Sequence, residues 1–316
     1  MNLKLPIVIL IAILPFTADA QLGGLVNKVK SKTKQRIDNK IDKEIDKSLD
    51  EIEGKKKTGT SSDPAPAPSE KKSEAKEAPR DNTPKSFKKY DFIPGDQILY
   101  YDAFEGEAMA ELPTNWNTSG TGEVTTLDKF PGNWLRVHKP FIYLSANEKD
   151  FGENFTIEFD VVLDLKNNGW GFPEFYFGIF STEDEPKTDN KFLREHKKYA
   201  SVVTTILPGA HRNSRARVNS YNETRSHFSG DPKAYEVLED YYGKPAHIAI
   251  QVQKERFRLW INEEKLFDVP KGVPLGHIMN QIYFEIGHTN YKEDQYAIYI
   301  SNIKVATGKP DTRHKL

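Results

Sequence analysis

Apolar and polar residues alternate through most of the chain between about residues 88 and 305, and this pattern limits the possible folds more than any other feature. The clearest case is 155–165, where Phe155, Ile157 and Phe159 alternate with Thr156 and Glu158. Successive side chains of a strand point to opposite faces, so a period of two over this length is typical of a half-buried strand.

The same alternation predicts further strands at 97–104, 123–127, 134–138, 141–144, 175–180, 201–207, 248–252, 257–261, 266–269, 282–286 and 298–305. Lys254 and Glu255 lie in the short gap between the strands 248–252 and 257–261, which predicts a hairpin. At Asn302 the apolar phase shifts by one residue. Two polar stretches, 189–199 and 232–242, are expected to carry helical turns.

About a dozen short strands with one polar face predict an all-β fold, an antiparallel two-sheet jelly-roll sandwich. A parallel βαβ fold is excluded because it needs helical crossovers, and no long helical pattern interrupts these strands. We assign the sandwich to residues 87–308 and a short tail to 309–316.

The first 20 residues have the pattern of a signal peptide. Lys4 precedes the apolar run 5–16, and Ala18-Asp19-Ala20 forms a small-x-small cleavage site, which predicts a mature chain that begins at Gln21. The run is shorter than the roughly 20 residues of a membrane-spanning helix, although an uncleaved anchor is the alternative. We therefore expect an exported protein of the periplasm or outer membrane, without a transmembrane helix in the mature chain.

Residues 21–54 are predicted to form a charged amphipathic helix. Its apolar face carries Ile37, Ile41, Ile45, Leu49 and Ile52. The helix at 24–54 either docks on a partner or a membrane surface, or lies against the protein's own sandwich. The following segment, 55–86, is rich in Pro, Ala, Lys and Glu, a composition that is typical of a disordered linker.

Composition removes several function classes. The chain contains no Cys, which excludes disulfides, thiolate zinc sites, iron–sulfur clusters and cysteine nucleophiles. A net charge of −1 argues against a nucleic-acid partner.

The opening of the predicted sandwich resembles a known family. The residues that carry this likeness are KYDFIPGD at 89–96, YDAF at 101–104, LPTNWNT at 112–118, GTGEV at 120–124 and FPGNWL at 130–135. The run is similar to the concanavalin A-like, laminin G-like region of Bacteroidota-type outer-membrane protein A family proteins. In that family a peptidoglycan-binding module follows the region, and no such module is expected here, so no peptidoglycan-contacting residue is carried over.

Five outward residues of the predicted strands form a candidate ligand platform. If the inward rows are assigned correctly, Trp260, Tyr283 and Tyr299 point to the opposite face together with Arg258 and Glu285. Aromatic faces stack on sugar rings and neighbouring charges bind hydroxyl groups. The alternative is that loops or a third layer cover these aromatic side chains.

Two acidic groups are further candidates. Asp102, Glu105 and Glu107 follow the first predicted strand and supply the oxygen ligands that a structural calcium ion prefers, although a solvated turn is the favoured explanation. Glu158 and Asp160 begin the alternating acid pattern of concanavalin-like glycoside hydrolases, but the required second Glu is missing. We expect no other cofactor.

These observations lead to a non-catalytic envelope protein whose sandwich binds a glycan or an envelope protein. A glycoside hydrolase with a non-standard acid pair is the first alternative, and a structural spacer is the second.

Overall fold

The computed structural model describes residues 90–308. The predicted signal peptide (1–20), helix (21–54), linker (55–86) and tail (309–316) lie outside these residues and stay predictions. Within 90–308, no helix has the length and apolar character needed to cross a membrane.

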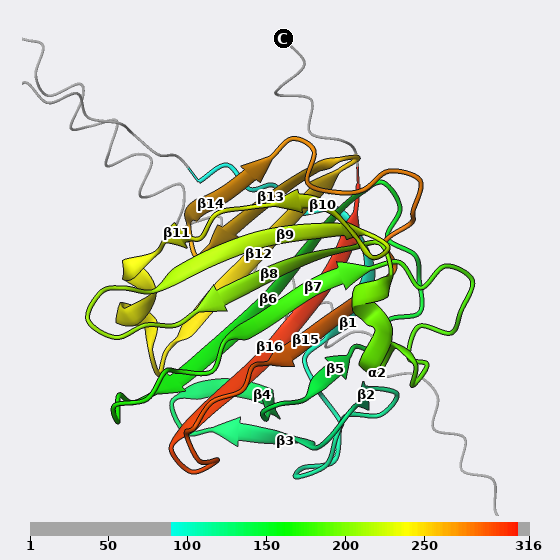
Figure 1. Cartoon of the computed structure of the whole chain (residues 1–316). Coiled ribbons are helices and arrows are strands. Elements are labelled where there is room, and N and C mark those ends of the chain that lie inside the picture. The colour runs from blue at the N-terminus through cyan, green and yellow to red at the C-terminus, as the bar shows by residue number, and fades with distance from the viewer. Residues whose placement is uncertain (1–89, 309–316) are drawn as a thin grey trace, which may run out of the picture. The chain divides into compact units, whose positions relative to one another are not determined.

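The described residues fold into two antiparallel sheets that pack face to face (Figure 1). Sheet A has the order β14 (Glu264–Val269), β13 (Arg256–Ile261), β12 (Pro245–Gln253), β6 (Asn154–Leu165), β16 (Tyr296–Thr307), β4 (Phe130–Val137) and β3 (Gly122–Leu127), and β1 (Gln97–Asp102) pairs with β16. Sheet B has the order β10 (Arg225–Ser229), β9 (Arg215–Asn222), β8 (Ser201–Leu207), β7 (Phe175–Phe180), β15 (Gln281–Ile286), β5 (Ile142–Leu144) and β2 (Asn117–Thr118), and β11 (Lys233–Ala234) pairs with β9. The prediction of an antiparallel two-sheet sandwich is confirmed.

Aromatic rings fill the space between the sheets. Phe159 of sheet A meets Phe177 and Phe284 of sheet B edge to face, at centroid distances of 5.1 and 5.2 Å. Every second residue of β6 joins this core, which is why the period-two pattern identified the strand.

Several local predictions are confirmed. The hairpin forms between β12 and β13, with Gln253 paired to Arg256 around the two-residue turn. The register between β16 and β6 shifts between Ser301 and Lys304, where Asn302 adopts a positive φ of 53°. This bulge lets Ile303 and Val305 return to the core.

The two polar stretches carry the expected helical turns. The first contains α2 (Phe192–Glu195) and η1 (His196–Lys198), and the second contains η2 (Glu236–Tyr241). Strands β9 and β10 were not predicted from the sequence. The inward residues of β9 are Ala216, Val218 and Ser220, which are too small and too polar to give a strong apolar signal.

Candidate functional site

The structure divides the predicted five-residue platform between two surfaces. Trp260 and Arg258 lie on β13 and Tyr299 lies on β16, all in sheet A, whereas Tyr283 and Glu285 lie on β15 of sheet B. Each points away from the core on its own sheet, and the outer faces of a sandwich point in opposite directions. A single platform of all five residues is therefore wrong.

On sheet A, the segment that precedes β1 covers Trp260. The Phe92 ring packs on the indole at a centroid distance of 5.3 Å, and Asp91 Oδ1 accepts a 3.1 Å hydrogen bond from Trp260 Nε1. Trp260 is only 1% exposed as a result. Its role is to hold this segment on the sheet, which is the covered arrangement that the sequence analysis left as the alternative.

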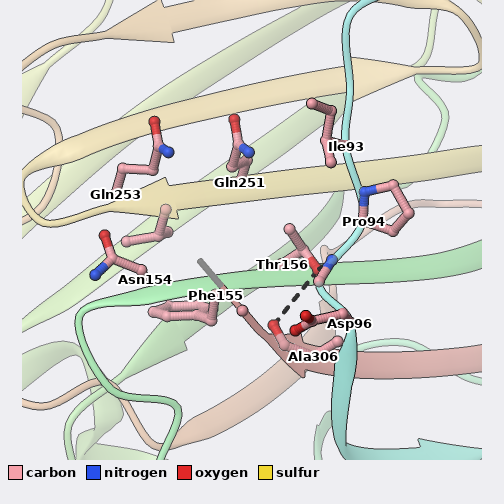
Figure 2. A pocket seen from close by; sticks show the side chains of 12 residues that line it. Ile93, Pro94, Asp96, Asn154, Phe155, Thr156, Gln251, Gln253 and Ala306 are labelled. Carbon is pink, nitrogen blue, oxygen red and sulfur yellow. Dashed lines mark hydrogen bonds between the residues drawn. The ribbon is translucent and has the colours of Figure 1, made fainter. Parts of the chain in front are cut away.

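Beside the same segment, sheet A has a small groove (Figure 2). The side chains of Gln251 and Gln253 lie along one part of it, and Ile93 and Pro94 of the crossing segment lie beside them. Its volume of about 220 Å³ is below the roughly 300–1,000 Å³ of most ligand sites. The carboxamide oxygens of both glutamines accept hydrogen bonds from Arg258 Nη1, at 2.6 and 2.8 Å, so this surface is engaged in internal bonds.

On sheet B, Tyr283 is covered by η1 and by its own neighbours. The His196 ring lies 4.6 Å from the Tyr283 ring, and Phe180 lies 6.0 Å away. The Tyr283 ring leans over Gly178, where an added Cβ would lie 2.7 Å from a ring carbon. Tyr283 has no exposed surface and acts as a packing residue under this helical turn.

Glu285, by contrast, belongs to a polar row on the outer face of sheet B. The strand registers pair Glu285 with Tyr176, Tyr176 with Thr205, and Thr205 with Arg217. These four residues therefore form a straight line across β15, β7, β8 and β9, with strands about 4.8 Å apart. We call this line the Arg217 row.

Three side chains in or beside the row already have partners, namely Lys197, Glu285 and Tyr176. Lys197 Nζ lies 2.9 Å from Glu285 Oε2 and 5.6 Å from the centre of the Tyr176 ring. Burial would raise the pKa of Glu285, but the neighbouring His196 and Lys197 side chains outweigh it and lower the pKa. The Tyr176 hydroxyl donates a hydrogen bond to the Glu174 carboxylate. Burial, together with this hydrogen bond, raises the pKa of Tyr176. At neutral pH the row therefore contains an ionised Glu285 and a protonated phenol.

A larger groove opens at one end of this face, and we call it the Trp170 groove. Its volume is about 530 Å³, within the range of ligand sites. It is lined by Asn167, Gly169, Trp170, Gly171, Phe172, Glu174, Leu207, Pro208, Gly209, Ala210, His211, Asn213 and Arg215. Trp170 is 58% exposed, although an indole of this size is usually covered.

Hydrogen bonds fix both walls of the Trp170 groove. In one wall, Tyr291 Oη donates to the carbonyl of Trp170 at 3.2 Å and Thr289 Oγ1 donates to the carbonyl of Gly171 at 2.7 Å. In the other, the Glu239 carboxylate accepts bonds from the backbone N–H groups of Arg212, Asn213 and Ser214, at 2.8, 2.8 and 3.1 Å. The backbone around the exposed indole is thus held in place before any ligand arrives.

Trp170 was not among the site residues predicted from the sequence. The signal that could have identified it is a Trp between two glycines, in the polar run 166–171 that follows a strand. Such a loop has too few apolar neighbours to bury an indole.

Glu158 and Asp160 lie on the outer face of sheet A within an ion network. His247 Nδ1 lies 2.8 Å from Asp160 Oδ1, and Lys304 Nζ lies 2.6 Å from Glu158 Oε1. Asn302 Nδ2 donates to Asp160 Oδ2 at 2.8 Å. Burial would raise the pKa of Glu158, but the bonds from His247 and Lys304 outweigh it and lower the pKa. A general acid needs a raised pKa, so the lowered pKa of Glu158 does not suit that role.

The predicted calcium ligands do not converge. Asp102 accepts hydrogen bonds from Tyr100 Oη, Phe104 N and Trp116 Nε1 at 2.8, 2.9 and 2.9 Å. Glu107 Oε2 accepts bonds from the N–H and hydroxyl of Thr114, both at 2.9 Å. Across residues 90–308, no group of three or more His, Asp or Glu side chains is arranged to hold a metal ion. The protein's own donors use oxygens of Asp102 and Glu107, so the structure gives no support to the calcium site at Asp102, Glu105 and Glu107, which stays a prediction.

Comparison with known proteins assigns this chain to no family. No protein-family model matches the chain, and no curated protein matches it, so membership of the outer-membrane protein A family stays a prediction. The carbohydrate recognition domain of Emp46p in its potassium-bound form is similar over 62% of this chain and 90% of that one, at 11% identity and a TM-score of 0.46. A protein of unknown function with a galectin-like fold from Bacillus subtilis is similar over 68% of this chain and 99% of that one, at 10% identity and a TM-score of 0.46.

A beta-glucanase from Bacillus licheniformis is similar over 66% of this chain and 98% of that one, at 10% identity and a TM-score of 0.43. Likeness at these values concerns the fold alone. The class that the fold and the site define is an antiparallel two-sheet sandwich with a polar, partly open outer face. The sheet order and the core described above establish that class independently of these likenesses.

Proposed function

We propose that this chain is a non-catalytic module of the cell envelope whose sandwich binds a glycan in the Trp170 groove. The observation that carries the proposal is the exposed indole of Trp170 at the mouth of a groove of about 530 Å³. A flat aromatic face stacks on the apolar face of a sugar ring, and the surrounding polar groups bind its hydroxyls. His211, Asn213 and Arg215 supply such groups here.

The proposed location in the cell envelope is supported by the sequence alone. The predicted signal peptide supports export, and the likeness of 89–135 to the region upstream of a peptidoglycan-binding module supports an envelope setting. On this view the segment 21–86 sets the distance between the sandwich and its place of attachment.

The two alternatives differ in what they require of the structure. A glycoside hydrolase needs one carboxyl that stays protonated near neutral pH, whereas Glu158 is held ionised by Lys304 and His247. A structural spacer has no need of an exposed Trp above a groove with hydrogen-bonded walls. Glycan binding accounts for the exposed indole, so we prefer it to both.

A glycan array with the full chain tests the proposal. Trp170→Ala should weaken binding at least tenfold, equivalent to about 1.4 kcal/mol, and leave the thermal midpoint of unfolding unchanged. Tyr101→Ala is the matched control, since Tyr101 is an exposed aromatic residue on sheet A, away from the groove. Equal binding by wild type and Trp170→Ala, or no binding to any glycan by wild type, would refute the proposal and favour the spacer.

A further inference from the structure

We propose that the Arg217 row binds a carboxylate group, so that the ligand of the neighbouring Trp170 groove is an acidic glycan that contains uronic acid. This inference rests on the proposed glycan-binding function and adds the chemical class of the ligand.

The first step concerns the Arg217 guanidinium, which has no partner within the described residues. None of its nitrogens takes part in a hydrogen bond or an ion pair there, and its Nε is buried without an acceptor. A guanidinium keeps its charge at every physiological pH, and a buried donor without an acceptor is costly. A ligand acceptor would remove this cost.

The second step is that the row cannot supply the missing acceptor itself. Glu285 is paired with Lys197 at 2.9 Å, and Glu174 accepts the hydroxyl of Tyr176. Both carboxylates near the row are therefore occupied by other donors. The remaining member, Thr205, is 1% exposed, so its hydroxyl is closed off beneath its neighbours. An anion from outside is the group that fits Arg217.

The third step identifies the anion by its geometry. A guanidinium presents its N–H groups as a planar fork, and a carboxylate accepts two of them in parallel. Tyr176 adds an aromatic ring on β7, two strands away from Arg217. The positive charge of Arg217 acts to lower the pKa of this phenol, against the larger effect of burial. A sugar ring that carries a carboxylate matches this combination of cation and aromatic surface.

The fourth step connects the row to the Trp170 groove. Arg215 lines that groove and precedes Arg217 by two residues on the same face of β9. Residues at this spacing on a strand are about 7 Å apart. Neither arginine forms an ion pair with the described residues. A polysaccharide seated on Trp170 can therefore pass Arg215 and reach Arg217 without leaving the face of sheet B.

The test uses the full chain with polygalacturonate, alginate and hyaluronan, each beside its carboxyl-reduced neutral form. We expect wild type to bind at least one acidic form at least tenfold more tightly than its reduced counterpart. Arg217→Gln should bring this ratio close to one. Arg225→Gln, which removes the same charge from an exposed position on β10, should keep the wild-type ratio. Thermal unfolding of each variant checks that the fold is intact.

The outcomes separate this inference from the proposed function. If Arg217→Gln keeps the wild-type ratio, the carboxylate site is refuted. If wild type binds neutral glycans through Trp170 and prefers no acidic form, the carboxylate site is refuted and the proposed function stands. If wild type binds neither the acidic nor the neutral glycans, both the carboxylate site and the proposed function are refuted.

Discussion

The ion network around His247 makes the stability of the sandwich depend on pH. His247 on β12 bonds Asp160 at 2.8 Å and lies 3.5 Å from Glu158, both on β6. These two partners, Asp160 first, raise the pKa of His247 from its usual 6.5 to about 9. A raised pKa in the folded state means that the protonated form stabilises the fold. The contribution is complete below about pH 6.5 and is lost as the pH rises through about 9.

The size of the effect follows from this pKa and from the exposure of the ring. A change from 6.5 to about 9 corresponds to an upper limit of about 3.4 kcal/mol, at roughly 1.36 kcal/mol for each pH unit. The side chain of His247 is 38% exposed, so solvent screens its ion pairs strongly. We therefore expect a contribution of about 1 kcal/mol.

Urea unfolding of wild type and His247→Gln at several values between about pH 6 and pH 10 measures this contribution. Other groups titrate in this interval, but they titrate in both proteins, so the difference between the two isolates His247. Wild type should be the more stable by about 1 kcal/mol at the acidic end, and most of this advantage should disappear at the alkaline end. An advantage that does not change with pH would show that His247 acts through packing, and the linkage argument would be refuted.

Two further predictions concern the core and the cation site expected at Asp102. Phe284→Ala should lower the free energy of unfolding by about 3–5 kcal/mol, because its ring packs between both sheets, whereas Tyr299→Ala on the outer face should cost about 1 kcal/mol or less. Similar losses in urea unfolding for the two variants would contradict the assignment of the core. Asp102→Asn should cost about 1–3 kcal/mol through weakened bonds to its three donors, and millimolar calcium should leave the thermal midpoint of wild type unchanged. A calcium-dependent rise in that midpoint would restore the predicted cation site.

Much of the fold could be predicted from the sequence, because strand patterning is local. The alternation along 155–165 identified the central strand β6, and Lys254 and Glu255, in the middle of the four residues between Val252 and Phe257, indicated the turn of a hairpin. The phase shift at Asn302 located the bulge in β16. In each case a run of neighbouring residues contains the whole signal, since burial on one face of a strand imposes a period of two.

The candidate site could be predicted only in part. Glu285 was correctly expected to point outward, but its row partner Arg217 lies on β9, a strand whose small inward residues hid it from the pattern. Trp170 lies in a loop, where no periodicity applies.

For the strands that it identified, the sequence by itself determined which residues face away from the core. It did not determine which outward residues share a surface, and the division of Trp260 and Tyr283 between two sheets shows the difference. Strand order depends on pairing between segments that are far apart in the chain, such as β7 with β15 and β6 with β16. Coverage of an outward residue depends on distant segments too, as Phe92 on Trp260 and His196 on Tyr283 illustrate. These contacts are decided by packing in three dimensions, for which a pattern along one strand carries no information.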